Sequence, residues 1–258
     1  MPSIPFKTIS PVSSMRKLAI GAWSSPNDPS VNVQLDLDVT KLVAYLDTQP
    51  GITLKHALVK IFSTTIHNVP ELNTVLIRSK FRQRLNNRIF IPTVFRHRSV
   101  LDLNGIAIDD AYAMSLTNLK STWDQKISDL RSGADRPIHR VAAIFKRLPS
   151  WLCRPAIKLV EFIQYTCNVS LGAFGLPNDR FGSMTITFLD KYDIKYAAIP
   201  IYSFSRSPIT LAIGKTMKDG DKKIVPVTCT FDHRCFDGFE GSLGIKELKK
   251  ILNQPQLL

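Results

Sequence analysis

The sequence predicts an α+β fold in which helices cover a large mixed β-sheet. Helical and strand patterns are mixed along the chain, but they do not alternate in the strict strand–helix–strand order of a parallel α/β protein. From Met184 onward strand patterns follow one another closely, and a helical pattern ends the chain. A length of 258 residues with 44% hydrophobic residues is ample for one large core. We therefore expect a single domain over residues 1–258.

The periodicity of side chains assigns the elements of the N-terminal half. Residues 31–38 alternate apolar and polar side chains, as a half-buried strand does. Asp38 and Thr40 are alternative N-caps for the helix that follows. A stronger helix opens after Thr53 and ends before Val69-Pro70. In chain order the expected elements are a helix at 15–20, a strand at 31–38, helices from about 40 and from 53, strands at 74–77, 89–95 and 99–108, and a helix at 115–130.

The C-terminal third is dominated by apolar and β-branched runs, which favour strands. Asp219-Gly220-Asp221 is a turn signal between two of these runs, so we expect a hairpin there. The expected strands lie at 184–189, 196–202, 209–213 and 223–230, and the final helix lies at about 239–252.

Residues 134–175 differ in character and predict a basic helical insertion. The stretch from Arg136 to Lys158 carries six basic residues and no acidic one. Pro149 and Pro155 are expected to break the insertion into short helices. One interpretation is a helical element packed on its own domain. The other is a basic amphipathic element, over residues 136–168, that contacts a membrane surface or an acidic partner.

The bulk composition excludes several classes of function. A net charge of +13 attracts anionic ligands, but the chain carries no zinc finger, RNA-binding motif or basic tail, and we expect no nucleic-acid partner. The four cysteines form no CxxC pair, so free thiols and no metal site are expected. No apolar stretch is long enough to span a bilayer, and the N-terminus lacks a signal-peptide pattern. A cytoplasmic protein is therefore predicted.

The most informative stretch is Asp232-His233-Arg234-Cys235-Phe236-Asp237-Gly238, which follows an apolar run at 224–230 and precedes a helical pattern. A histidine can accept a proton near neutral pH. An aspartate four residues later can fix the loop, and a glycine lets the backbone turn where a side chain would obstruct. The order of these residues predicts a reactive loop between a strand and a helix.

The run from His233 to Gly238 matches an HxxxDG signature, which Asp232 extends to DHRxxDG. It resembles the catalytic domains of dihydrolipoyl acyltransferases from 2-oxo acid dehydrogenase complexes, whose relatives include chloramphenicol acetyltransferase. The resemblance covers nearly the whole chain except about residues 134–175, and it implies a chloramphenicol acetyltransferase-like fold with a single acyltransferase-like catalytic domain. Five segments before the motif also resemble the family, in the order in which the family has them. They are Ser14–Ala19, His56–Asn73, Met114–Leu116, Gly182–Thr187 and Ser207–Gly214.

The resemblance implies an acyl transfer between the thiol of coenzyme A and a thiol, hydroxyl or amine of an unidentified acceptor. His233 would be the general base that takes the proton of the attacking group. The hydroxyl of Thr187 would donate to the oxyanion of the tetrahedral intermediate, with Thr185 as the competing choice.

Two further residues would support the site by the same resemblance. Asp237 would pair with Arg16 and hold the histidine loop, because an arginine–carboxylate pair fixes geometry well. Gly238 would allow the backbone to turn where a side chain would obstruct. Subunits of the family form trimers with each site at a subunit junction, so His233 and Thr187 would come from neighbouring subunits of a homotrimer.

Departures from the family pattern leave alternatives open. Phe188-Leu189-Asp190 stands where the family commonly has Asn-Leu-Gly, and we expect no lipoyl domain, lipoyl group or subunit-binding domain on this chain. The chain is then a free-standing acyltransferase, a catalytically inactive trimeric scaffold of the same fold, or an enzyme whose chemistry faces lipid. The basic run Arg78–Arg88, with Arg96 and Arg98, either attracts coenzyme A or is a solvated hairpin face.

Overall fold

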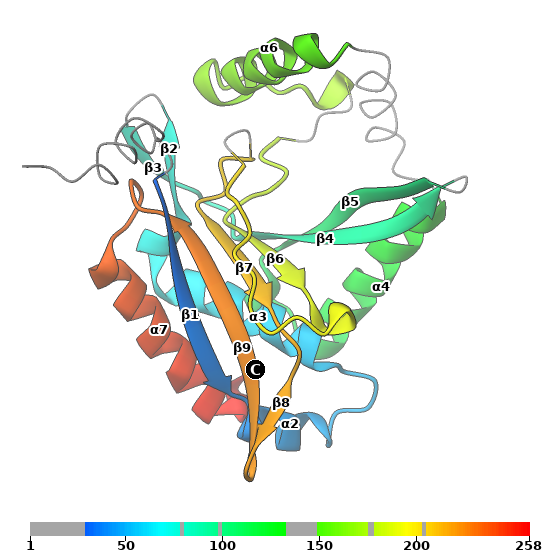
Figure 1. Cartoon of the computed structure of the whole chain (residues 1–258), viewed down its shortest axis with the longest axis vertical. Coiled ribbons are helices and arrows are strands. Elements are labelled where there is room, and N and C mark those ends of the chain that lie inside the picture. Colours follow the sequence, from blue (N-terminus) through cyan, green and yellow to red (C-terminus); the bar gives the residue numbers. More distant parts are fainter. Residues whose placement is uncertain (1–28, 78–79, 98–99, 133–148, 175–177, 203–204) are drawn as a thin grey trace, which may run out of the picture.

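The structure is a computed structural model that describes residues 29–77, 80–97, 100–132, 149–174, 178–202 and 205–258 (Figure 1). The helix expected at 15–20 lies outside these ranges. The strands are β1 (Ser30–Asp38), β2 (Thr74–Ile77), β3 (Lys80–Gln83), β4 (Arg88–His97), β5 (Val100–Asp109), β6 (Met184–Phe188), β7 (Ile209–Ile213), β8 (Met217–Asp219) and β9 (Lys222–Asp232). The longer helices are α2 (Thr40–Leu46), α3 (Leu54–Asn68), α4 (Leu116–Ser132), α6 (Ser150–Glu161) and α7 (Gly238–Asn253).

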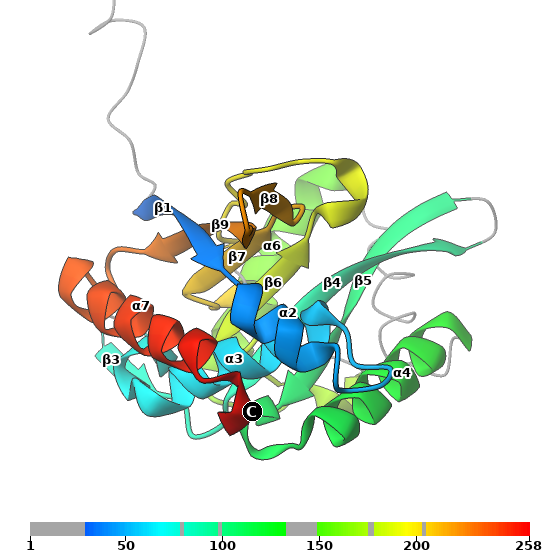
Figure 2. The same cartoon turned by 90° about the horizontal axis from the view of Figure 1, so that it is seen from below.

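The described strands confirm the predicted α+β fold with a large mixed sheet. Seven of them form one sheet in the order β1-β9-β7-β6-β4-β5, with β8 paired to β9, and β2 and β3 form a separate pair. The β4–β6 and β6–β7 pairs are parallel, whereas the other pairs of the large sheet are antiparallel. Helices α2, α3, α4 and α7 cover one face of this sheet, while α6 lies beyond one of its ends (Figures 1 and 2).

The two faces of the central strands differ because side chains alternate along a strand. The register aligns Ile186 with Leu211 and Cys229, and these side chains belong to the core beneath the helices. The next aligned row points to the opposite face and consists of Thr187, Ala212 and Thr228. The helix-covered face is therefore apolar, and the other face carries hydroxyl groups.

One expected strand, Tyr196–Tyr202, is wrong, because this segment has no regular structure. Both edges of β7 are already paired, with β6 on one side and β9 on the other. The segment instead runs over the hydroxyl-bearing face (Figure 1), where the Tyr196 hydroxyl donates to Asp36 Oδ1 at 2.6 Å. The carbonyl oxygen of Lys195 lies against Gly214 and leaves no room there for a Cβ atom.

Two local predictions also need correction. The N-cap of α2 is Val39 rather than Asp38 or Thr40, although Asp38 Oδ1 accepts the Thr40 N–H at 3.0 Å. Pro149 directly precedes α6 as expected, but Pro155 lies inside that helix and does not end it. A proline removes one main-chain hydrogen bond, and α6 continues beyond this loss to Glu161.

The start of α3 depends on a histidine. The Thr53 N–H donates to His56 Nδ1 at 3.2 Å, so the imidazole satisfies one of the main-chain donors that a helix start leaves open. His56 is buried, with its ring edge-on to Trp123 at 5.3 Å. Burial lowers the pKa of His56 below its ordinary value of 6.5, which keeps the acceptor nitrogen unprotonated at neutral pH.

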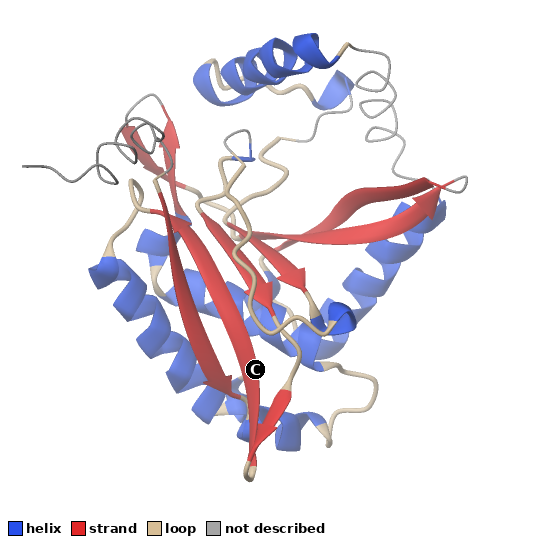
Figure 3. Cartoon of the chain, viewed as in Figure 1, coloured by secondary structure: helices blue, strands red, loops and turns tan. Residues whose placement is uncertain are grey.

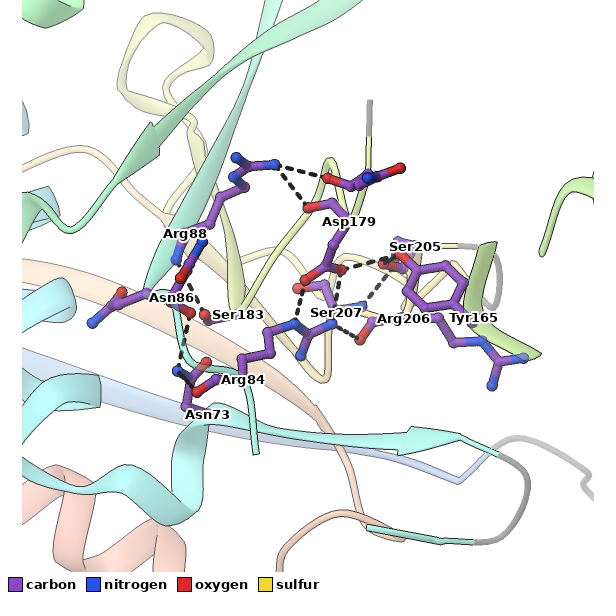
Figure 4. A network of polar contacts seen from close by, with 12 residues as sticks. Asn73, Arg84, Asn86, Arg88, Tyr165, Asp179, Ser183, Ser205, Arg206 and Ser207 are labelled. Atoms are coloured by element: carbon purple, nitrogen blue, oxygen red, sulfur yellow. Dashed lines mark hydrogen bonds and ion pairs between the residues drawn. The ribbon is translucent and has the colours of Figure 1, made fainter. Parts of the chain in front are cut away.

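Arg84, directly after β3, is the centre of a polar network that ties α6 and the turn after it to the sheet (Figure 4). Its side chain is 7% exposed and holds Asp179 through Nε–Oδ2 at 2.6 Å and Nη2–Oδ1 at 3.1 Å. The Tyr165 hydroxyl, from the turn that continues α6, donates to Asp179 Oδ1 at 3.1 Å. Burial raises the pKa of Tyr165, so this hydroxyl keeps its proton. The Asp179 carboxylate thereby joins the β2–β3 hairpin to the turn that follows α6.

Arg206 completes the network. Its guanidinium pairs with Glu161 at the end of α6, and its carbonyl oxygen accepts from Arg84 Nη2 at 2.8 Å. Asp179 and Arg206 have φ values of 43° and 51°. This left-handed conformation costs a non-glycine residue about 1 kcal/mol or more, and the network holds both residues in it.

We expect His56 to make stability pH-dependent in a window below pH 6.5. Because the native pKa is lowered from 6.5, the unfolded chain takes up the proton first as the pH falls, and the free energy of unfolding decreases. His56→Gln keeps an acceptor without titrating. Urea unfolding at about pH 7.5 and about pH 5.5 should show a larger loss for the wild type than for the variant. Equal losses would contradict this role.

Arg84→Met should lower the free energy of unfolding by about 2–4 kcal/mol, because it leaves the Asp179 carboxylate without its arginine partner. Urea unfolding measures this value. Arg82→Met is the matched control, since Arg82 lies exposed on the same hairpin; its effect should stay within about 0.5 kcal/mol. Indistinguishable losses from the two variants would show that the pair does not stabilise the fold.

Candidate active site

The stretch from Asp232 to Asp237 joins β9 to α7, as the sequence predicts for a loop between a strand and a helix. Asp232 is buried, and its carboxylate accepts the Arg234 N–H at 2.9 Å and Arg234 Nη2 at 2.7 Å. The Cys235 N–H donates to the Asp232 carbonyl at 2.9 Å. Phe236 is buried, with its ring centroid 5.7 Å from that of Phe231. The loop is therefore fixed at both ends.

His233 presents its imidazole at the surface of this fixed loop. Its main-chain N–H donates to the carbonyl oxygen of Pro29 at 2.9 Å, while the side chain is exposed. The ring lies over that of Phe231, with centroids 5.9 Å apart and planes inclined by 28°. A held backbone with an exposed ring suits a group that exchanges protons with a bound molecule.

Asp237 supports the loop as the N-cap of α7. Its Oδ1 accepts the Phe239 N–H at 2.7 Å, and its own N–H donates to Glu240 Oε2 at 3.0 Å. The hydrogen bond from Phe239, the interaction with Glu240 and the nearby charge of His233 lower the pKa of Asp237. The predicted partner Arg16 lies outside the described residues.

The described residues leave space around Gly238. Among them, a Cβ atom at this position would meet nothing within 4 Å. Gly238 is the first residue of α7, a conformation that other residues adopt equally well. The chain turns here because the Asp237 side chain caps the helix.

Thr187 lies far from His233 within one chain. It is level with Ala212 and Thr228, while His233 follows Thr228 by five residues on the other side of β7. With about 4.8 Å between strands and about 3.3 Å per residue, the two Cα atoms lie roughly 19 Å apart. Thr185, the competing choice, points to the same face of the sheet as Thr187. It lies beside Thr210, two residues nearer to the end of the sheet that carries His233. The chain therefore brings His233 and Asp237 together, but neither threonine.

Phe188, Leu189 and Asp190, which depart from the family's Asn-Leu-Gly, make packing and polar contacts in the structure. Lys55 Nζ lies 3.0 Å from Asp190 Oδ1 and 5.3 Å from the centroid of the Phe188 ring. Leu189 is buried, and its N–H donates to the Ile213 carbonyl at 2.8 Å. These contacts fix the end of β6 directly beside Thr187.

The basic run Arg78–Arg88 is partly used in ion pairs within the chain. Arg84 holds Asp179, and Arg88 Nε donates to Asp109 Oδ1 at 2.5 Å. Lys80 and Arg82 are exposed on β3. Arg78 and Arg98 lie outside the described ranges.

The cysteines beside the site are protonated thiols. Burial raises the pKa of Cys229 to about 12, and burial with the nearby Asp232 raises that of Cys235 to about 11. Within the described ranges no group of three or more histidine, cysteine and acidic residues is placed to hold a metal ion. No helix in those ranges is long and apolar enough to cross a membrane.

The sequence alone does not indicate that the Asp232 carboxylate binds both the main chain and the guanidinium of Arg234. Opposite charges two residues apart inside the motif were the available signal. Thr228 was also missed: its hydroxyl is buried and has no hydrogen-bond partner among the described residues. No local pattern marks it, because its burial depends on how distant strands pair with β9.

No protein-family model matches the sequence, and no curated protein matches it. The structure is similar to solved structures. The cubic core of a pyruvate dehydrogenase multienzyme complex shares 18% identity over 100% of both chains, with a TM-score of 0.62. The Azotobacter vinelandii dihydrolipoamide acetyltransferase (E2p) shares 18% identity over 99% of this chain and 98% of its own, with a TM-score of 0.61.

A chloramphenicol acetyltransferase is similar over 87% of this chain and 89% of its own, at 11% identity and a TM-score of 0.51. The TM-scores establish that the folds are similar, but sequence identities this low do not establish a shared reaction. The chemistry has to be argued from the site residues. The protein has the chloramphenicol acetyltransferase-like fold, in the form seen in dihydrolipoamide acetyltransferase catalytic cores.

Proposed function

We propose that the protein is a coenzyme A-dependent acyltransferase in which His233 is the general base. The observation that carries the proposal is the exposed imidazole on a fixed loop of an acyltransferase fold. The similar Azotobacter vinelandii enzyme was studied for the catalytic roles of a serine, a histidine and an asparagine. There the histidine and asparagine lie four residues apart, which is the spacing of His233 and Asp237.

In the proposed reaction the acyl group passes from the thiol of coenzyme A to a nucleophile of the acceptor. His233 takes the proton of the attacking thiol, hydroxyl or amine, which then adds to the carbonyl carbon of the acyl group. The Thr187 hydroxyl donates to the resulting oxyanion, an interaction worth about 3 kcal/mol in comparable sites. When the carbon–sulfur bond breaks, the proton on His233 passes to the thiolate of coenzyme A. Acyl-coenzyme A acts here as a substrate.

The separation of roughly 19 Å between His233 and Thr187 supports a site built from two subunits. One chain supplies the base and the neighbouring chain supplies the oxyanion donor. In a closed ring of identical subunits, each junction then holds one complete site. We propose a homotrimer, which the family resemblance implies.

His233→Ala should reduce acyl transfer by about 10²- to 10⁴-fold, because the attacking group loses its base. Release of free thiol from several acyl-coenzyme A species, with candidate thiol, hydroxyl and amine acceptors, measures the rate. His67→Ala is the control, since that exposed histidine stacks on Tyr112 away from the motif. If wild type and His233→Ala give the same rate, His233 is not the base. If calorimetry also detects no binding of coenzyme A, the inactive scaffold is favoured.

Mixing two inactive variants tests the shared site. His233→Ala and Thr187→Val subunits, unfolded and refolded together in equal amounts, should regain about a quarter of the wild-type rate. That is the share of junctions that pair an intact histidine with an intact threonine. Each variant refolded alone should stay inactive. A site contained in one subunit would regain nothing on mixing.

A further inference from the structure

Helix α6 presents an outward face that is both aromatic and basic. Trp151 and Leu159 of α6 are 75% and 59% exposed, and Phe162, directly after the helix, is 52% exposed. Arg154, Pro155 and Lys158 are also exposed. Counted from Trp151, the other five follow after 3, 4, 7, 8 and 11 residues, a spacing that places side chains on one side of a helix. Large exposed apolar side chains that gather on one face mark an interaction surface.

The charges on this outward face have one sign. Glu161, the acidic residue of α6, turns inward to Arg206, and its side chain is only 14% exposed. Arg154 and Lys158 remain outside. The partner of this surface is therefore anionic.

The position of α6 also restricts its partner. Figure 3 shows the helix beyond one end of the sheet, apart from the helices that cover the sheet face. Its contacts with the core run through Glu161 and through Tyr165 in the following turn. The outward side is a convex helix surface about 18 Å long, without a groove to receive a peptide. Two copies of this cationic face would repel each other.

We propose that the outward face of α6 binds the surface of an anionic lipid bilayer. The helix lies parallel to the membrane, with Trp151, Leu159 and Phe162 in the boundary between headgroups and acyl chains. Arg154 and Lys158 bury their aliphatic stems there and pair their charges with lipid phosphates. The proposal does not depend on catalysis by His233.

Vesicle co-sedimentation at about 0.15 M salt tests the proposal. The full-length protein should bind phosphatidylcholine vesicles with about 30% phosphatidylglycerol at least tenfold more strongly than phosphatidylcholine alone. Arg154→Glu with Lys158→Glu should reduce binding about tenfold or more. Trp151→Ala with Phe162→Ala should also reduce it, because the apolar contribution is lost. Circular dichroism checks that these surface variants are folded.

The matched control separates a specific face from the overall positive charge. Lys246→Glu with Lys249→Glu changes the net charge equally on exposed positions of α7, and its binding should stay within about twofold of wild type. An equal loss in this control would overturn the proposal in favour of nonspecific attraction. Failure of the wild type to bind anionic vesicles would overturn it as well, and would favour an acidic protein as the partner.

Discussion

The pairing of β9 with β1 on one side and β7 on the other is the constraint on which the rest of the structure depends. This register places the apolar row under the helices and the hydroxyl row on the opposite face. It also delivers His233 to one end of the sheet and leaves Thr187 towards the other. A shift by one residue would exchange the two faces, so the core and the candidate site depend on the same hydrogen bonds.

Rigid attachment of the histidine loop has a clear physical origin. A buried carboxylate, that of Asp232, is satisfied by its neighbour Arg234, and the buried ring of Phe236 holds the other side. Asp237 then starts the final helix. In the proposed reaction, a base held in this way does not need to be ordered when a substrate binds, which lowers the entropic part of the barrier.

Much of this architecture could be predicted from local sequence. The ends of α3 follow from Thr53 and Pro70, and β2 begins and ends where the pattern predicts. The error at Tyr196–Tyr202 arises because an apolar run does not reveal whether a strand edge is free to pair with it. The motif likewise predicts the position of His233 on a loop. It cannot show the distance to Thr187, which depends on register between distant strands. Arg84 and Asp179 are 95 residues apart, and neither has a local signal that names the other.

The network around Arg84 makes residues 149–174 and the sheet one structural unit. Removal of residues 134–175 would take away Tyr165 and Glu161, and would leave the partly exposed guanidinium of Arg206 without its acidic partner. A deletion of these residues therefore changes the ion pairs of the sheet as well as the segment itself. The segment is energetically coupled to the hairpin, and a shortened protein is not a neutral probe of the remaining fold.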